Sequence, residues 1–313
     1  MKMKNFFAVN TALVLILLAA CSVVKPTLEP TQTAQVQPVT GIKYHFVTNK
    51  LLIPTTQAQT QSYALNLDGD PQNQPDNMLG GLLSMLTSAA PSLDLQSTVD
   101  QAVTGGQLVS LHLVKADDPL NDPSVSWSIF QGQKTQSAPK FDGSDKFMLD
   151  PAAPTSSLVV GSLTNGHFTG GPGTTRVQIF LLGQSVDVNL IGVRLEADLS
   201  ATGCANGKMG GGVTVDEFRG KLLPAIVDGL NGIIKTDKTV AAPILQVLDS
   251  DQNGTITIQE LENNPLLVVA LSPDLDLLDT SGKFNPGQDG VKDSYSLGLG
   301  FTCVPATFTA PGD

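Results

Sequence analysis

Basic residues are scarce in this chain, and their scarcity limits the partners that it can have. The 313 residues include 18 Lys and Arg against 29 Asp and Glu, which gives a formal net charge of −11 at pH 7. Proteins that bind nucleic acid need clustered positive charge to neutralise phosphates. The sequence therefore predicts no nucleic-acid partner.

Aromatic and charged residues are also uncommon, at 5% and 15% of the chain. Glycine is abundant, with 30 residues, and Val, Leu and Thr recur. This composition favours strands and turns over long helices. The length allows one large domain or two ordinary ones, each able to bury a core.

The common signatures of hydrolases are missing too. Neither a G-x-S-x-G nor an H-E-x-x-H pattern occurs. None of the histidines, His45, His112 and His167, adjoins a plausible nucleophile, so we expect them on the surface, with His112 on the polar face of a strand. No catalytic residue is assigned, and a non-enzymatic role is favoured.

Three carboxylates keep an enzymatic alternative open. Asp142, Asp145 and Asp150 lie close in sequence, as in Asp-rich turns, and spacing alone cannot bring two of them to the separation that glycoside hydrolysis requires. An exported hydrolase, for example a glycosidase, with a structural calcium remains the alternative to a binding or structural role.

The N-terminus has the pattern of an export signal. Lys2 and Lys4 precede a mostly apolar run over residues 6–18, and the small residues Ala19 and Ala20 follow. This run is too short to predict a membrane span. The sequence predicts a signal peptide over residues 1–20.

Residues 18–21, Leu-Ala-Ala-Cys, resemble the lipobox of bacterial lipoproteins. The resemblance implies that Cys21 becomes the lipidated first residue of the mature chain and makes the membrane a partner. Ser22 after it implies an outer-membrane or cell-surface destination. Several acyl chains would anchor the chain firmly, since each buried methylene contributes ~0.8 kcal/mol.

With Cys21 lipidated under that resemblance, two cysteines remain in a compartment that permits disulfides. Cys303 continues the alternating apolar positions of residues 295–301, and Cys204 follows another alternating stretch. We expect Cys204 and Cys303 to pair; two unlinked buried thiols are the alternative.

Two parts follow the predicted signal peptide along the chain. Residues 21–40 are rich in Pro, Thr and Gln and predict a flexible tether. Residues 41–313 predict a single β-rich α+β domain. A helical, EF-hand-like region at about residues 214–280 is inserted between its strands.

Apolar alternation predicts strands over residues 109–113, 125–129, 186–199 and 295–301, with Trp127 in the core. Asn165-Gly166 predicts a two-residue hairpin, and the phase slip at Ile191-Gly192 predicts a β-bulge. Helical spacing predicts helices over residues 79–86, capped by Asp76-Asn77, and from Asp94 to a stop at Gly105. The predicted fold class is α+β, an antiparallel β-sheet or sandwich with an inserted helical EF-hand-like calcium region.

The third section is predicted to be helical. Thr214 and Glu217 have the spacing of a capping box, and Pro224 predicts a bend in the helix that follows. A second helix is expected over residues 240–248. Pro265 should end the helix after residue 260 and open another through Leu271.

Between these helices, residues 249–260 have the pattern of a calcium-binding loop. Short oxygen ligands at alternate positions, a Gly at the sixth and a Glu at the twelfth wrap one Ca²⁺ ion. Gly254 provides the sharp turn. The predicted ligands are Asp249, Asp251, Asn253, Thr255, Thr257 and Glu260.

Two further acidic segments resemble the calcium repeats of thrombospondin type 3 and dockerin modules, with residues inserted. Either segment is a possible further metal site and a possible partner of the main loop; Asp-rich turns are the alternative. Their candidate ligands are Asn66, Asp68, Asp70 and Asp76 in the first, and Asp274, Asp276, Asp289 and Asp293 in the second.

Most of the chain resembles a group of bacterial surface lipoproteins that carry an EF-hand calcium loop and have no established activity. The residues that carry the resemblance are 63–70, 76–80, 168–173, 249–260, 271–276, 289–293 and 297–300. It implies calcium binding and export. Because Pro265 should cut short the exit helix, a structural ion is expected rather than a sensor. A calcium-dependent adhesin with a protein or glycan partner remains a further alternative.

Overall fold

The computed structural model describes residues 41–70, 76–90, 93–153 and 157–311. All described strands and helices fall in one compact unit, Pro38–Asp313, which holds its own sheet and core and can therefore fold by itself. The predicted signal peptide, the tether and Cys21 lie outside the described residues. No helix in the described ranges has the length and hydrophobicity needed to span a membrane.

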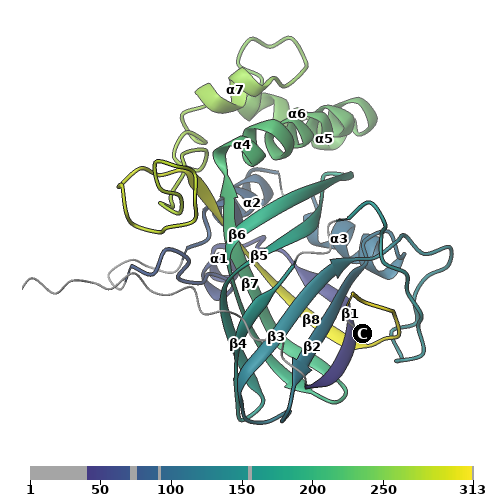
Figure 1. Ribbon diagram of the computed structural model, residues 1–313. Helices are drawn as coiled ribbons and strands as arrows, with labels where there is room; N and C mark the ends of the chain where they lie inside the picture. The colour runs from purple at the N-terminus through teal and green to yellow at the C-terminus, as the bar shows by residue number, and fades with distance from the viewer. Residues whose placement is uncertain (1–40, 71–75, 91–92, 154–156, 312–313) are drawn as a thin grey trace, which may run out of the picture. The chain divides into compact units, whose positions relative to one another are not determined.

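Eight antiparallel strands form the body of this unit, and each pairs with the next along the chain (Figure 1). The last strand pairs with the first, so the sheet closes into a barrel. This confirms the predicted antiparallel sheet; its closure was not predicted. The strands are β1 (Ile42–Leu52), β2 (Ser110–Ala116), β3 (Asp122–Gln131), β4 (Val159–Thr164), β5 (His167–Leu181), β6 (Gln184–Ser200), β7 (Gly203–Thr214) and β8 (Ser294–Pro305).

Helices occupy two of the connections. Between β1 and β2 lie α1 (Gln57–Ser62), α2 (Met78–Ala89) and α3 (Leu95–Thr104). Between β7 and β8 lie α4 (Val215–Glu217), the π-helical turn η1 (Phe218–Leu222), α5 (Leu223–Thr236), α6 (Lys238–Leu248) and α7 (Ile258–Asn263). The predicted helix starts are confirmed, because Asn77, Asp94 and Thr214 each cap a helix with their side chains. Near Pro224, where a bend is expected, the chain has the π-helical turn η1, which ends at Leu222, two residues before the proline.

Two local features of the sheet match their sequence signals. Asn165 and Gly166 connect β4 to β5 with φ angles of 51° and 79°, as a two-residue hairpin turn requires. Gly192 has φ 61° and is the extra residue where Gly173 pairs with Val193 and Thr174 with Ile191. The predicted hairpin and β-bulge are therefore confirmed.

Both faces of β2 are buried, although the alternation of apolar and polar residues in its sequence predicts one buried and one exposed face. Leu111 and Leu113 belong to a small apolar cluster with Phe147 and Phe308, separate from the main core. Residues 145–147 and 306–308 cover this face, joined to each other by a bridge between Lys146 and Thr307. His112 therefore points to the opposite face, among the residues of the main core.

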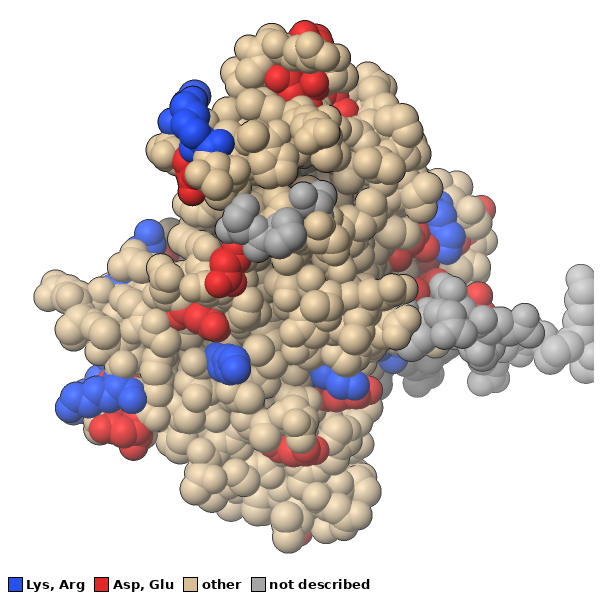
Figure 2. Space-filling model, turned by 180° about the vertical axis from the view of Figure 1, so that it is seen from behind, with Lys and Arg blue, Asp and Glu red and all other residues tan. Residues whose placement is uncertain are grey.

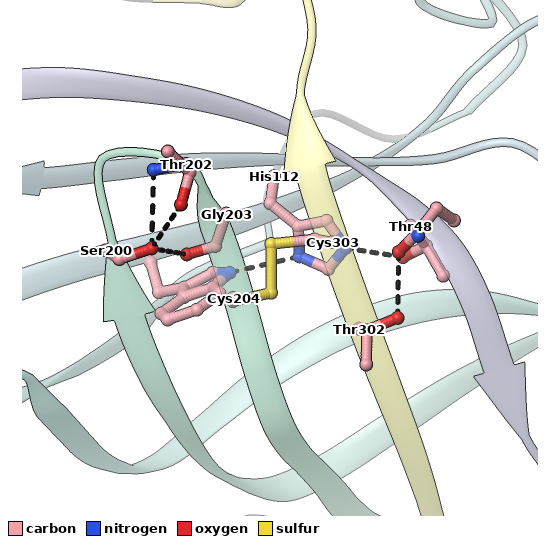
Figure 3. The surroundings of a disulfide bond; sticks show 10 residues. Thr48, His112, Ser200, Thr202, Gly203, Cys204, Thr302 and Cys303 are labelled. Carbon is pink, nitrogen blue, oxygen red and sulfur yellow. Dashed lines mark hydrogen bonds between the residues drawn. A yellow bond between two sulfur atoms is a disulfide. The ribbon is translucent and has the colours of Figure 1, made fainter. Parts of the chain in front are cut away.

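The prediction that His112 lies on a polar surface is wrong. Its Nε2 lies 2.7 Å from Thr48 Oγ1, and Trp127 Nε1 donates to its Nδ1 at 3.0 Å (Figure 3). Since an indole nitrogen can only donate, Nδ1 is the acceptor and Nε2 carries the proton. The ring stacks on Phe301 at 5.4 Å, and burial lowers the pKa of His112 to about 3. Trp127 is buried, as predicted.

The predicted disulfide is confirmed. Cys204 and Cys303 stand opposite each other in the β7–β8 ladder, with their Cα atoms 4.8 Å apart (Figure 3). They are separated by 99 residues, and this stretch includes α4 to α7. The bond cross-links β7 to β8 at the end of their ladder opposite the inserted helical region, which leaves β7 after Thr214 and rejoins β8 at Ser294.

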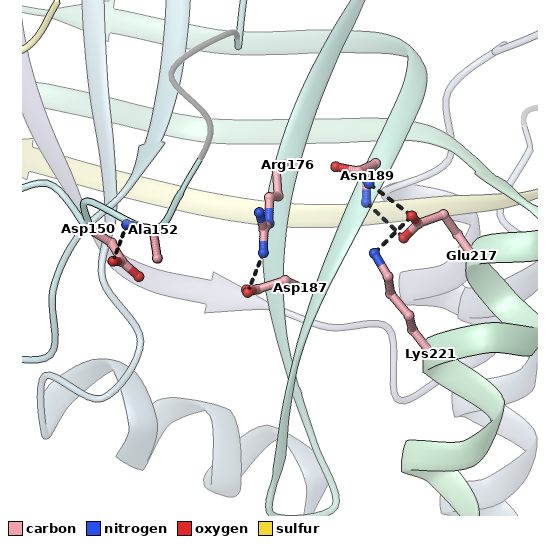
Figure 4. Close-up of polar contacts among 7 residues, drawn as sticks. All are labelled: Asp150, Ala152, Arg176, Asp187, Asn189, Glu217 and Lys221. Carbon is pink, nitrogen blue, oxygen red and sulfur yellow. Dashed lines mark hydrogen bonds and ion pairs between the residues drawn. The ribbon is translucent and has the colours of Figure 1, made fainter.

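A polar cluster joins the helical region to the outside of the barrel (Figure 4). Glu217 Oε1 accepts hydrogen bonds from Asn189 Nδ2 on β6 and from Lys221 Nζ, both at 2.8 Å. Burial acts to raise the pKa of Glu217, but the bonds from Lys221 and Asn189 outweigh it and leave the pKa below its usual value. Beside it, Arg176 pairs with Asp187 at 2.7 Å across the β5–β6 hairpin.

The buried imidazole predicts an acid-sensitive fold. An unfolded histidine takes up a proton near pH 6.5, whereas His112 stays neutral to about pH 3. Its contribution to stability is complete above pH 6.5 and is lost as the pH falls towards 3. Between pH 7.5 and 5 the free energy of unfolding should fall by about 2 kcal/mol more in the wild type than in His112→Leu.

Urea unfolding of residues 38–313 at the two pH values measures this difference. His167→Gln is the comparison variant, because it removes a histidine that lies on the surface beside Asp198 and leaves the core unchanged. An identical pH dependence in wild type and His112→Leu would contradict the assignment.

Candidate metal centre

Residues 249–260 connect α6 to α7 at the end of the helical region far from the barrel (Figure 1). Helix α6 ends with Asp249 as its C-cap, and α7 begins after Thr257 as its N-cap. Acidic side chains gather at this end of the molecule in the space-filling view (Figure 2). The two helices thus hold a short acidic loop between them.

Three carboxylates of this loop converge. Asp249, Asp251 and Glu260 each offer one oxygen, and the three atoms lie within 4.8 Å of one another. Across the described ranges, this is the one group of three or more acidic, His or Cys side chains close enough to hold a metal ion. Gly254, at φ 84°, makes the turn that brings the ends of the loop together. The arrangement can bind a cation through oxygen atoms.

Hydrogen bonds within the loop fix these side chains. Asp249 accepts from the amides of Asn253 at 3.0 Å and Gly254 at 2.8 Å. Asp251 also accepts from the amide of Asn253, at 3.1 Å, and Asn253 Oδ1 accepts from the amide of Thr255 at 2.9 Å. Each carboxylate oxygen has more than one lone pair, so an oxygen that accepts one amide can still face a cation.

Glu260 closes the loop by bonding to both of its ends. Its Oε1 accepts from the amide of Ser250 at 2.9 Å, and its Oε2 accepts from the amide and the hydroxyl of Thr257, each at 2.9 Å. Burial acts to raise the pKa of Glu260, but the bonds from Thr257, Asp251 and Ser250 outweigh it and lower the pKa. Glu260 is therefore charged at neutral pH. The hydroxyl of Thr257, a predicted ligand, is engaged in the capping box of α7.

Asn231 on α5 completes the loop, and no sequence signal marked it. Its Oδ1 accepts from the amide of Ile256 at 2.8 Å, and its Nδ2 donates to the carbonyl of Ile256 at 2.7 Å. One side chain thus gives Ile256 the two hydrogen bonds that a neighbouring strand would give. A contact across 25 residues leaves no trace in local spacing.

The chain after the loop follows the predictions only in part. Helix α7 ends at Asn263, so the short exit helix before Pro265 is confirmed. The predicted helix through Leu271 is wrong, because residues 265–271 form turns. The β-branched Val268 and Val269 disfavour a helix there. Tyr295 on β8 donates its hydroxyl to the carbonyl of Leu271 at 3.0 Å and holds the end of these turns.

The first of the further acidic segments is built as a turn. Asn66 Oδ1 accepts from the amide of Gly69 at 2.7 Å, and Asp68 accepts from the amide of Asp70 at 3.0 Å. Asp76 is buried and accepts from the amide of Leu67 at 2.8 Å. These oxygens satisfy backbone groups, and the described part of the segment holds no set of three converging carboxylates.

The second segment is fastened to β8 in the same way. Asp274 accepts from the amide of Ser296 and Asp276 from that of Gly290, at 2.8 and 2.7 Å. Asp289 accepts from the amide of Val291 and Asp293 from that of Leu278, at 2.9 and 2.8 Å. No three carboxylates converge among these described residues either.

The two further segments lie against each other. Leu65 and Leu67 of the first form a small buried cluster with Leu275 and Leu277 of the second. Burial raises the pKa of Asp76 to about 6, and the charges of Asp68 and Asp274 add to the rise while Lys292 opposes it. The two acidic segments are far apart in the sequence, but the fold packs them against each other.

The carboxylates considered for hydrolysis serve local turns. Asp142, Asp145 and Asp150 accept from the backbone amides of Ser144, Phe141 and Ala152, and Figure 4 draws the bond of Asp150. His167 lies 2.7 Å from Asp198 at the surface.

No family model, curated protein or solved structure matches the chain.

Removing the Asn231 amide should loosen the loop. Asn231→Leu leaves the amide of Ile256 without a partner in a buried position, which costs about 1–3 kcal/mol. We expect a lower free energy of urea unfolding and weaker cation binding by residues 38–313. Asp228→Leu, at an exposed position of the same helix, is the control and should leave both unchanged. Equal free energies of unfolding and equal cation binding in the two variants would show that Asn231 does not support the loop.

Proposed function

We propose that this chain is a calcium-binding protein, anchored by lipid on Cys21 to the outer membrane or cell surface, in which calcium stabilises the fold. The observation that carries the calcium proposal is the convergence of oxygen atoms from Asp249, Asp251 and Glu260 within 4.8 Å. The protein then has a structural or binding role. The anchor rests on the lipobox-like residues 18–21.

The donor set favours calcium over other cations. The candidate ligands are carboxylate, amide, hydroxyl and carbonyl oxygens, which suit a hard cation, whereas zinc sites use Cys and His. The twelve-residue spacing with Gly254 at the sixth position is that of an EF-hand loop, with α6 entering and α7 leaving. A bound ion would also offset the repulsion between carboxylates that meet in a chain of net charge −11.

Three features support a fixed site rather than a sensor. Helix α7 has six residues, so it is too short to swing as a lever. The pairing of Ile256 with Asn231 ties the loop to α5. The turns after Pro265 are held to β8 through Tyr295. A sensor needs a helix pair that opens on binding, and here both sides of the loop are attached to packed elements.

Calcium should raise the melting temperature of residues 38–313. Binding to the folded state alone stabilises it by about 2.7 kcal/mol when the free ion is at a hundred times its Kd. Glu260→Gln should lose most of this gain, because it replaces the carboxylate that bonds both ends of the loop. Glu262→Gln is the matched control, since Glu262 lies on the same helix and pairs with Arg219 at 3.5 Å.

Differential scanning calorimetry in chelator, magnesium and calcium measures these shifts. A wild-type melting temperature that calcium leaves unmoved would refute the calcium proposal, as would equal gains in Glu260→Gln and Glu262→Gln.

The lipid anchor has its own test in the full chain. Expressed in a bacterium with an outer membrane and fed an alkyne-labelled fatty acid, the wild type should carry label and sediment with membranes. Cys21→Ala removes the thiol that would be acylated and should lose both properties, whereas Cys204→Ala should keep the label. Label that persists in Cys21→Ala would count against the anchor.

A further inference from the structure

A cavity of about 900 Å³ lies between α2 and α6, apart from the acidic loop. One wall comes from residues 55–61 and α2, and the other from α6, Leu230 and residues 266–267. The apolar lining includes Leu86, Leu93, Leu230, Ile244, Val247 and Leu248. Its volume lies within the range of small-molecule sites, roughly 300–1,000 Å³.

Among the described residues that line the cavity there is no Asp, Glu, Lys or Arg. Its polar groups are uncharged hydroxyls and amides on the first wall, from Thr55, Thr60, Gln61, Ser84 and Ser88. A carboxylate or phosphate placed inside would lose its hydration without gaining a counter-charge. The lining therefore complements a neutral ligand that is mostly hydrocarbon and has a small polar end.

The rim is apolar as well. Met85 and Leu266, both in the lining, are 40% and 63% exposed, and Val269, three residues after Leu266 in the chain, is 70% exposed. Large apolar side chains exposed at the edge of a cavity are a feature of binding sites. The rim thus offers an apolar entrance to an apolar interior.

We propose that this cavity binds the hydrocarbon chain of a neutral amphiphile, with the polar end against the hydroxyl and amide wall. Because the lining is uncharged, it fits a neutral head group better than an ionised one. Because the α6 wall is apolar, it fits an alkyl chain better than a polar ligand such as a sugar. This site does not rest on calcium binding or on the lipid anchor.

Displacement of a neutral fluorescent probe, N-phenyl-1-naphthylamine, from residues 38–313 tests the proposal. The competitors are 1-decanol, 1-undecanol and 1-dodecanol, with dodecanoate as the charged counterpart. We expect affinity to rise up to about fourfold with each added methylene. Dodecanol should compete at least tenfold better than dodecanoate.

Gly81 allows a variant that fills the cavity without disturbing the core. It lies on α2 in the lining, and a Cβ built there meets no atom within 4 Å. Gly81→Phe places a ring in the cavity and should weaken binding at least tenfold. Gly232→Phe is the matched control on α5: its Cβ is equally free, it lies outside the lining, and it should bind as the wild type does.

Absence of saturable displacement, equal binding by Gly81→Phe and Gly232→Phe, or a preference for dodecanoate would each overturn the proposal. If circular dichroism shows that Gly81→Phe is unfolded, Val247→Glu takes its place. This variant introduces a charge into the lining from the half-buried α6 wall, and it should abolish displacement by dodecanol.

Discussion

Pairing of β8 with both β7 and β1 is the interaction on which the other parts of this structure depend. It closes the sheet and pairs the edges of β1 and β8, while the β5–β6 hairpin extends beyond its neighbouring strands over residues 175–190. It also provides the anchor points for both helical connections. Ser296 binds Asp274, Tyr295 binds the carbonyl of Leu271, and Gly298 exchanges hydrogen bonds with Asn77 at the start of α2.

Two asparagines use the same device at distant places. Asn77 accepts from the amide of Gly298 and donates to its carbonyl, at 2.8 and 3.2 Å. Asn231 does the same with Ile256 in the acidic loop. In each case a side-chain amide pairs with a backbone segment as a strand would, because it carries one acceptor and a donor in a fixed geometry. Irregular segments are thereby held without further strands.

The features predicted from the sequence are those encoded by neighbouring residues. The turn at Asn165-Gly166, the bulge at Gly192, the caps of α2 and α3 and the spacing of the acidic loop all depend on contacts within a few positions. The disulfide could be predicted because only two cysteines remained once Cys21 was assigned to lipid.

What escaped prediction depends on distant partners. Alternation in β2 distinguishes two faces but cannot show that both are buried, so His112 was assigned to the surface although it bonds Thr48 and Trp127 in the core. Barrel closure, the pairing of Asn231 with Ile256 and the packing of the two further acidic segments join residues far apart in the chain. The helix expected after Pro265 failed because tertiary anchoring of Leu271 competes with weak local propensity.

Barrel closure also affects the kinetics of folding. Thr302 beside β1 donates to Asn49 across 253 residues of sequence, and the two strands are nearly the first and the last elements of the domain. A chain that emerges N-terminus first must therefore carry β1 with one free edge until almost all of the domain has been delivered. Long-range pairing of this kind slows folding, and an unpaired edge invites association with other chains. The topology thus makes the interval before β8 arrives the time of greatest risk of aggregation for this protein.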